Sequence, residues 1–95
     1  MTGYGDFATI QNNYVFHNLL LDTPEGSFCA YGGDTRSKPY PYGQNNTWTE
    51  NVFQRGTSGH CGYYAAMADF DVGVRGNTFT GNTWSDGFPF TAPDG

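Results

Sequence analysis

Two carboxylates lie close enough in the sequence to act together in catalysis. Asp69 and Asp71 flank Phe70. Alternate side chains of a β-strand point to the same face, so on a strand these carboxylates would lie about 6.5–7 Å apart. An inverting glycosidase separates its acid and its base by a similar distance, which leaves room for a water molecule. The simpler interpretation, which we favour, is that both side chains belong to a solvated strand face.

A metal or lyase site finds little support in the remaining polar residues. His60 precedes Cys61, but their spacing from Cys29 matches no common zinc-ligand pattern, so we predict no metal and no cofactor. A polysaccharide lyase would need a Lys or Arg base beside carboxylates that hold calcium. Lys38 follows Asp34 closely, in a segment that has the composition of an ordinary polar loop. We therefore predict no catalytic residue here, with His60, Asp69 and Asp71 as the only candidates.

Two tyrosines are candidates for ligand binding. Tyr40 and Tyr42 alternate with prolines in the segment 34–44, which we expect to be a long protruding loop. Flat aromatic rings on a stiff loop could stack against sugar rings. The alternative is that both rings pack against the body of the protein.

The elements that position these residues follow a sequence repeat with a period near 32. The segments 12–20, 45–53 and 76–84 align without gaps. Each contains an Asn, a large apolar residue two positions later, a second Asn and a second apolar residue. A period of this length with its own internal pattern predicts stacked repeats.

Each repeat has the composition of short strands rather than helices. In Thr47-Trp48-Thr49 a large aromatic residue alternates with β-branched ones, which favours a strand with one buried face. Trp48 and Phe53 are an odd number of residues apart, so a bend must separate them. We place the bend at Asn51, because Asn tolerates the left-handed conformation. These features favour an all-β fold, a parallel β-helix of about three coils.

Stacked coils would align equivalent residues in columns. Val15, Trp48 and Phe79 should stack inside, and Phe70, Val72 and Val74 should form a further strand. Tyr31 should stack on Tyr63. Two columns of amides should bond to one another and satisfy buried polar groups; their members are Asn13, Asn46 and Asn77, and Asn18, Asn51 and Asn82.

The two cysteines are also one repeat apart. Stacking would bring the Cα atoms of Cys29 and Cys61 to about 5 Å, within the range of a disulfide. A small even number of cysteines supports a bridge in an extracellular protein. The alternative is a pair of reduced, buried thiols.

The chain also resembles a known family. The resemblance covers roughly residues 10 to 87 and rests on Cys-Ala-Tyr-Gly-Gly (29–33), Asn-Asn-Thr-Trp (45–48), Cys-Gly-Tyr-Tyr (61–64) and the run 76–84. It looks like the C-terminal coils of secreted bacterial right-handed parallel β-helix repeat proteins. That family includes pectate lyases, polygalacturonases and phage tailspikes. The resemblance implies a right-handed β-helix outside the cell or on its surface.

The enzymes of that family are matched poorly. The segment 58–62 is similar to the Gly-His-Gly motif of polygalacturonases, but Cys61 breaks the match. The Asn-Thr-Asp and Asp-Asp motifs of those enzymes are not found in the chain. We therefore expect a non-catalytic segment with a structural or carbohydrate-binding role. The alternative is the C-terminal part of a lyase or glycoside hydrolase whose active site lies in other coils.

Length and charge limit the remaining possibilities. The 95 residues suffice for one domain, a partial β-helix with repeats near 10–42, 43–74 and 75–87 and a tail at 88–95. A net charge of −5 with four cationic residues argues against nucleic acid as a partner. No apolar run is long enough to span a membrane.

The two ends should differ. Phe88-Pro89-Phe90 should cover the C-terminal end of the core, whereas the segment 4–9 offers no helix to cover the first coil. Uncovered strand edges recruit other chains. We therefore expect self-association, or contact with a parent chain, at the N-terminal edge, with a polysaccharide as the other possible partner.

Overall fold

The protein was analysed as a computed structural model that describes residues 9–23, 25–34 and 37–91. These residues form short strands joined by turns and loops, and none of them is helical. The predicted all-β class is thus correct for the part of the chain that is described. The strands are β1 (Tyr14–Phe16), β2 (Leu19–Leu20), β3 (Ala30–Tyr31), β4 (Thr47–Thr49), β5 (Val52–Phe53), β6 (Met67–Ala68), β7 (Thr78–Thr80) and β8 (Thr83–Trp84).

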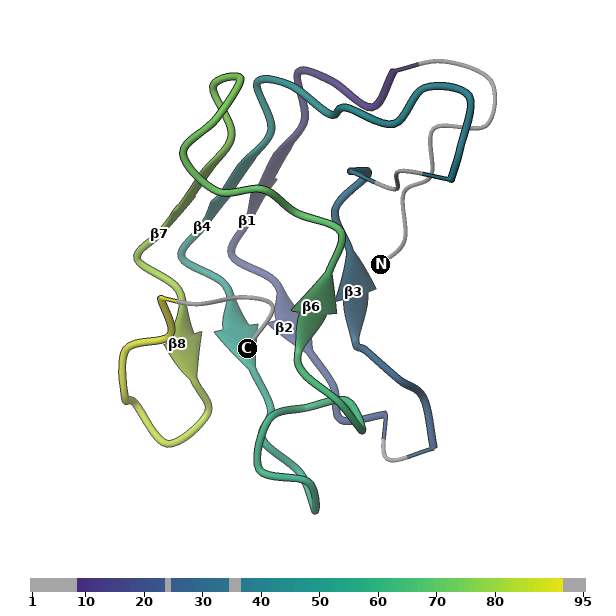
Figure 1. Cartoon of the computed structure of the whole chain (residues 1–95). Helices are drawn as coiled ribbons and strands as arrows, with labels where there is room; N and C mark the ends of the chain where they lie inside the picture. Colours follow the sequence, from purple (N-terminus) through teal and green to yellow (C-terminus); the bar gives the residue numbers. More distant parts are fainter. Residues whose placement is uncertain (1–8, 24, 35–36, 92–95) are drawn as a thin grey trace.

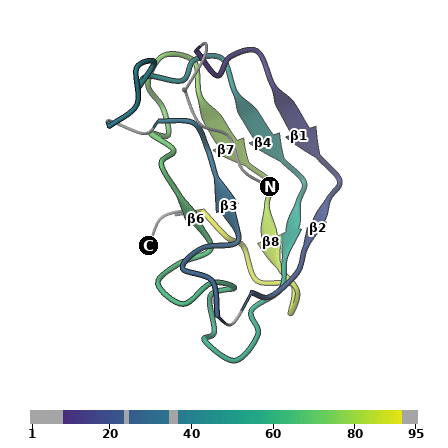
Figure 2. The same cartoon turned by 90° about the vertical axis from the view of Figure 1, so that its right-hand side faces the viewer.

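Every named strand pairs with a strand from the neighbouring repeat. The pairing is parallel throughout and forms three sheets, with strand orders β1-β4-β7, β2-β5-β8 and β3-β6. Figure 1 shows β1, β4 and β7 side by side, and Figure 2 shows the β3-β6 pair facing the other two sheets. Strands that follow one another in the sequence therefore belong to different sheets.

The core lies between the sheets and is largely aromatic. Val15, Trp48 and Phe79 are in register across the first sheet, as predicted. Trp48 and Phe79 are buried, and Val15, in the first repeat, is partly buried. The flanking threonines alternate to the outer face, because successive side chains of a strand point in opposite directions. Phe53 of β5, Met67 of β6 and Phe70, which follows β6, complete the core.

Two columns of asparagines join the repeats, as the sequence predicts. The Oδ1 atom of each Asn in the second and third repeats accepts the backbone N–H of the equivalent Asn one repeat earlier, over 3.0–3.2 Å. Its Nδ2 donates to the carbonyl three residues before that earlier Asn, at Ile10, Val15, Gly43 or Trp48. Every buried column amide thus has a donor and an acceptor partner, so its burial costs little.

The bends occur one residue earlier than expected. The left-handed residue is not Asn51 but Glu50, with φ of 55°. Every column asparagine follows a residue with positive φ; these residues are Asn12, His17, Asn45, Glu50, Gly76 and Gly81. Since the corner precedes the asparagine, the Asn side chain is free to turn toward the preceding repeat.

The third sheet has a different register from the other two. Tyr14 pairs with Thr47, 33 residues later, whereas Ala30 pairs with Met67, 37 residues later. The loop 54–66 is longer than its counterpart 21–29, and the loop 69–77 is shorter than its counterpart 32–46. The two changes nearly cancel, so the sequence repeat still has a period near 32.

This shift makes two predictions wrong. The strand expected through Phe70, Val72 and Val74 is absent: β6 is Met67–Ala68, and residues 72–76 form turns and a bend. Tyr31 pairs with Ala68 rather than stacking on Tyr63. Five residues lie between Cys61 and β6, whereas Cys29 directly precedes β3, so the longer loop separates the cysteine motif from the strand that follows it.

The predicted disulfide is present in spite of the shift. Cys29 and Cys61 are bonded, with a Cα–Cα distance of 6.0 Å. Backbone bonds run beside it, since Thr23 N–H donates to the carbonyl of Cys61 over 3.1 Å. The bridge therefore joins the loops 21–29 and 54–66 at the start of the β3-β6 sheet.

The C-terminal end of the core is covered, as predicted. Residues 88–90 turn back along β8: Phe90 N–H donates to the carbonyl of Asn82, and Pro89 forms an antiparallel bridge with Thr83. The buried ring of Phe90 stacks on Trp84 at a centroid distance of 4.2 Å. The expectations for the segment 4–9, apart from Thr9, and for the tail beyond residue 91 lie outside the described residues.

Candidate functional site

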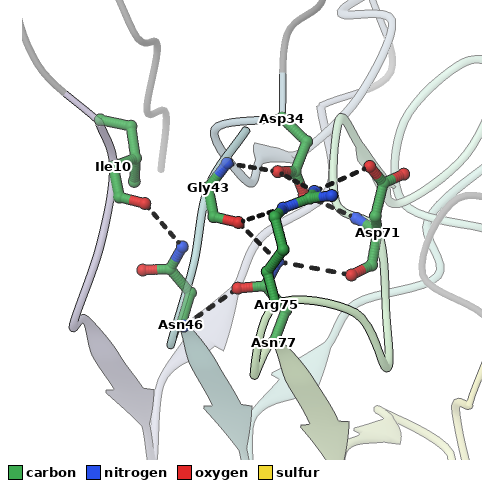
Figure 3. Close-up of polar contacts among 7 residues, drawn as sticks. All are labelled: Ile10, Asp34, Gly43, Asn46, Asp71, Arg75 and Asn77. Carbon is green, nitrogen blue, oxygen red and sulfur yellow. Dashed lines mark hydrogen bonds and ion pairs between the residues drawn. The ribbon is translucent and has the colours of Figure 1, made fainter. Parts of the chain in front are cut away.

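A buried carboxylate organises the loop that contains Tyr40 and Tyr42. The side chain of Asp34 is 1% exposed. It accepts the backbone N–H of Gly43 over 2.6 Å and that of Asp71 over 2.7 Å (Figure 3). The loop 34–44 is thereby closed on itself and held against the start of the turn that leads to β7.

Arg75 supplies the counter-charge for Asp34. Its Nη2 donates to Asp34 over 2.9 Å and to Asp71 over 3.1 Å, and its Nε donates to the carbonyl of Gly43 (Figure 3). Burial lowers the pKa of Arg75, but the hydrogen bonds and charges of Asp71 and Asp34 outweigh that effect and raise the pKa above its ordinary value. Arg75 therefore stays charged and crosslinks the two loops.

The same guanidinium positions Tyr42. Arg75 lies over the Tyr42 ring at 5.1 Å from its centroid, within the range of a cation–π contact. Tyr42 remains 52% exposed, and Tyr40 44% exposed. Both tyrosines are candidates from the sequence, whereas Asp34 and Arg75, which hold the loop, are not predicted from it. Their distance in the sequence leaves no local signal of the pair.

A second aromatic group lies beside the disulfide, and the sequence analysis did not assign it to ligand binding. Tyr63 and Tyr64 are 64% and 66% exposed, and their rings meet edge to face at a centroid distance of 4.9 Å. The partly buried ring of Phe28 lies 6.0 Å from Tyr64 and 5.6 Å from Tyr31. We call these four residues, Phe28, Tyr31, Tyr63 and Tyr64, the aromatic cluster.

The backbone beneath the aromatic cluster is firmly held. Tyr63 N–H donates to the carbonyl of Gly26, and Tyr64 N–H to that of Ser27. A Cβ atom at Gly62 would lie 2.5 Å from the Cα of Phe28, so only glycine allows the two loops to approach this closely. Together with the disulfide, these contacts fix two exposed rings without burying them.

The catalytic candidates are not assembled as an inverting glycosidase requires. That arrangement depends on a strand through residues 69–71, and no strand is present there. Asp69 instead takes a left-handed corner, with φ of 59°, and Asp71 pairs with Arg75. His60 hydrogen-bonds to the carbonyl of Tyr63 in the loop 54–66. The prediction that Asp69 and Asp71 share a strand face is therefore wrong.

Other functional classes were also searched for in the part of the chain that the structure describes. There, no group of three or more His, Cys, Asp or Glu side chains is placed to hold a metal ion. No helix long and apolar enough to cross a membrane occurs in the same residues.

The chain was compared with known proteins. No protein-family model matches it, and no curated protein or solved structure shows significant similarity to it.

Proposed function

We propose that this chain is a non-catalytic segment of an extracellular right-handed parallel β-helix and that it binds polysaccharide. The three parallel sheets, the stacked repeats and the columns of amides support the β-helix. The disulfide supports an oxidising compartment, since disulfides persist mainly outside the cytosol.

One observation carries the binding role: the aromatic cluster exposes two tyrosines on a backbone that is already held in place. Tyr63 and Tyr64 keep about two thirds of their surface in solvent. Exposed aromatic groups of this kind mark binding sites more often than scattered apolar residues do. A ring face attracts the C–H groups of a sugar, and each phenol adds a hydrogen-bonding oxygen. Because the backbone that carries the rings is already held, binding loses little backbone conformational entropy.

The charge of the protein favours a neutral polysaccharide. The net charge is −5, and Arg75, which lies over the Tyr42 ring, is neutralised by Asp34 and Asp71. An acidic polysaccharide such as polygalacturonate would be repelled by this surface. Tyr40 and Tyr42 form the second contact region in this proposal.

Affinity electrophoresis in gels that contain a soluble neutral β-glucan tests the proposal. We expect retardation of the native chain, and loss of about thirtyfold in affinity when Tyr63 and Tyr64 are both replaced by Ala, because stacking contributes about 1 kcal/mol for each ring. The Tyr14→Ala variant is the matched control, since Tyr14 is equally exposed, at 62%, and lies far from the cluster in the fold, on β1.

Two results would contradict the proposal. Equal retardation of the native chain and the double variant on every neutral glucan tested would remove the role of the cluster. Cleavage of pectin, alginate or a β-glucan that is lost in the Asp69→Asn, Asp71→Asn double variant would instead identify the chain as part of an enzyme.

A further inference from the structure

The asparagine columns have a direction. In each contact between repeats, the later Asn offers its Oδ1 to the backbone N–H of the earlier one and its Nδ2 to a carbonyl of the earlier repeat. Asn51, for example, accepts the N–H of Asn18 and donates to the carbonyl of Val15. Asn82 makes the same pair of bonds to Asn51 and Trp48. Each of these column side chains thus forms hydrogen bonds to the backbone of the preceding repeat.

The first members of the columns have only half of these bonds. Asn13 and Asn18 donate through their backbone N–H and their Nδ2 to Asn46 and Asn51, and Asn18 Nδ2 also donates to the carbonyl of Phe16. Within residues 9–23, 25–34 and 37–91, no donor reaches the Oδ1 of either residue. No strand in those ranges pairs with β1 or β2 on the side away from β4 and β5.

A hollow with both polar and apolar walls lies beside the unfilled acceptor of Asn18. It has a volume of about 250 Å³ and is lined by Asn18, Leu19, Leu20, Leu21, Thr23 and Cys29. In the next repeat, the corresponding place beside Phe53 is occupied by Leu20, its partner in register. The hollow is therefore where the apolar residue of a preceding repeat would pack. Leu19 and Leu21, each 60% exposed, form its rim.

The two ends of the molecule cannot simply stack on one another. At the C-terminal end, residues 88–90 cover the edge of β8 and the core below it. A second copy brought to the N-terminal edge by a twofold axis would run antiparallel to β1. It would also present amide oxygens to the oxygens of Asn13 and Asn18, so the bonds of the columns would not be reproduced.

We infer that the edge formed by β1 and β2 is a docking surface for one further repeat of the same asparagine-bearing type, stacked in parallel. That repeat would place backbone N–H groups over the Oδ1 atoms of Asn13 and Asn18. It would also place carbonyls over their Nδ2 atoms, and at Asn18 this carbonyl would take the place of that of Phe16. Its inward apolar residue would fill the hollow above Leu20.

The test is a lengthened chain in which residues 10–42 are duplicated in tandem, with residues 1–9 kept in front. The junction of residue 42 with the second Ile10 preserves the spacing, because Gln11 and Gln44 are paired in register. Asn13 and Asn18 of the second copy then become internal. They are replaced together by Ala in the lengthened chain and, as the control, in the original chain.

We expect the double substitution to lower the urea midpoint of the lengthened chain by about twice as much as that of the original chain, or by more. In the lengthened chain the substitutions leave buried partners unsatisfied. The lengthened chain with intact asparagines should unfold at a higher urea concentration than the original. If a double variant does not fold, the single Asn18→Ala substitution is compared in the two chains instead.

Three outcomes would overturn the inference. One is an equal fall of the midpoint in both chains. Another is a lengthened chain that is less stable than the original. The third is sedimentation of the original chain as a dimer that Asn13→Ala and Asn18→Ala dissociate, since a second copy would then occupy the edge.

Discussion

Successive repeats are held together differently in the sheets that contain the asparagine columns and in the β3-β6 sheet. In the column sheets, each repeat is joined to the next by the same amide bonds at the same positions. In the β3-β6 sheet, the register shifts and the loops differ in length. There the chain is held by two unique crosslinks, the disulfide and the ion pair of Asp34 with Arg75.

The difference shows where repeated hydrogen bonds are sufficient to hold the repeats together and where they are not. A repeated bond tolerates no change of length, since a shift of one residue would turn every column side chain to the wrong face. A loop whose length differs between repeats cannot use the repeated bonds and needs a crosslink of its own. The disulfide lies where the second repeat is longer, and Asp34 lies where it is shorter. Both candidate ligand-binding regions are on these variable loops, as is common for binding residues.

Emptying the core of the column sheets should have the largest effect. Trp48 is 4% exposed and stacks between Val15 and Phe79. We expect Trp48→Ala to lower the free energy of unfolding by about 3–5 kcal/mol, the usual range for removing a buried aromatic side chain. Urea denaturation followed by circular dichroism measures the change. The exposed Tyr14→Ala on β1 should cost far less, and a similar loss in both variants would contradict the register.

Removing the disulfide beside the β3-β6 sheet should have the second-largest effect on stability. Replacing Cys29 and Cys61 together by Ser should lower stability by about 2–4 kcal/mol, because the bridge restrains a long loop in the unfolded chain. Thermal unfolding with and without reductant measures the effect. Reductant should lower the unfolding temperature of the native chain and leave that of the variant unchanged. Alkylation of the unreduced native chain, followed by mass measurement, should modify neither cysteine.

A single column amide should matter less. Asn51 has no exposed surface and bonds to four groups in the neighbouring repeats through its side chain. Asn51→Ala leaves buried partners unsatisfied, so we expect a loss of about 1–3 kcal/mol in urea denaturation. Asn51→Asp should be at least as destabilising as Asn51→Ala, because a buried carboxylate oxygen would then face the carbonyl of Val15 and the Oδ1 of Asn82. A loss below that of Asn18→Ala, at the exposed end of the same column, would count against the importance of the column.

The smallest expected effect concerns a surface ion pair. The hydrogen bond from Arg55, which lies 2.7 Å from Asp86, lowers the pKa of the Asp86 carboxyl. A depressed pKa stabilises the fold above the unfolded value of about 4, and this contribution disappears as the pH falls through the folded value. The native chain should therefore be slightly more stable than Asp86→Asn at pH 7, and the urea midpoints should converge near pH 2. A constant difference over this range would exclude the pair as its cause.

The sequence predicts the regular part of the fold far better than the variable part. Asn46 and Trp48 recur at fixed spacing, and their environment is set by the equivalent residues of the next repeat, so periodicity alone places them. The bond of Asp34 to Arg75 joins residues 41 positions apart and occurs once, so no pattern reveals it. The strand expected at Phe70 was wrong for the same reason: local alternation was present, but the short loop 69–77 leaves no length for a strand.

The turn of residues 88–90 against β8 has a consequence for how the chain folds. The named strand pairs join residues 31 to 37 positions apart, whereas Thr83 and Pro89 meet within a single short turn. Closing a long loop costs chain entropy before any contact rewards it, and parallel pairing is slow for that reason. Phe90 and Trp84 can therefore meet early, before the repeats pair. Folding should then proceed from the turn of residues 83–90 toward β1.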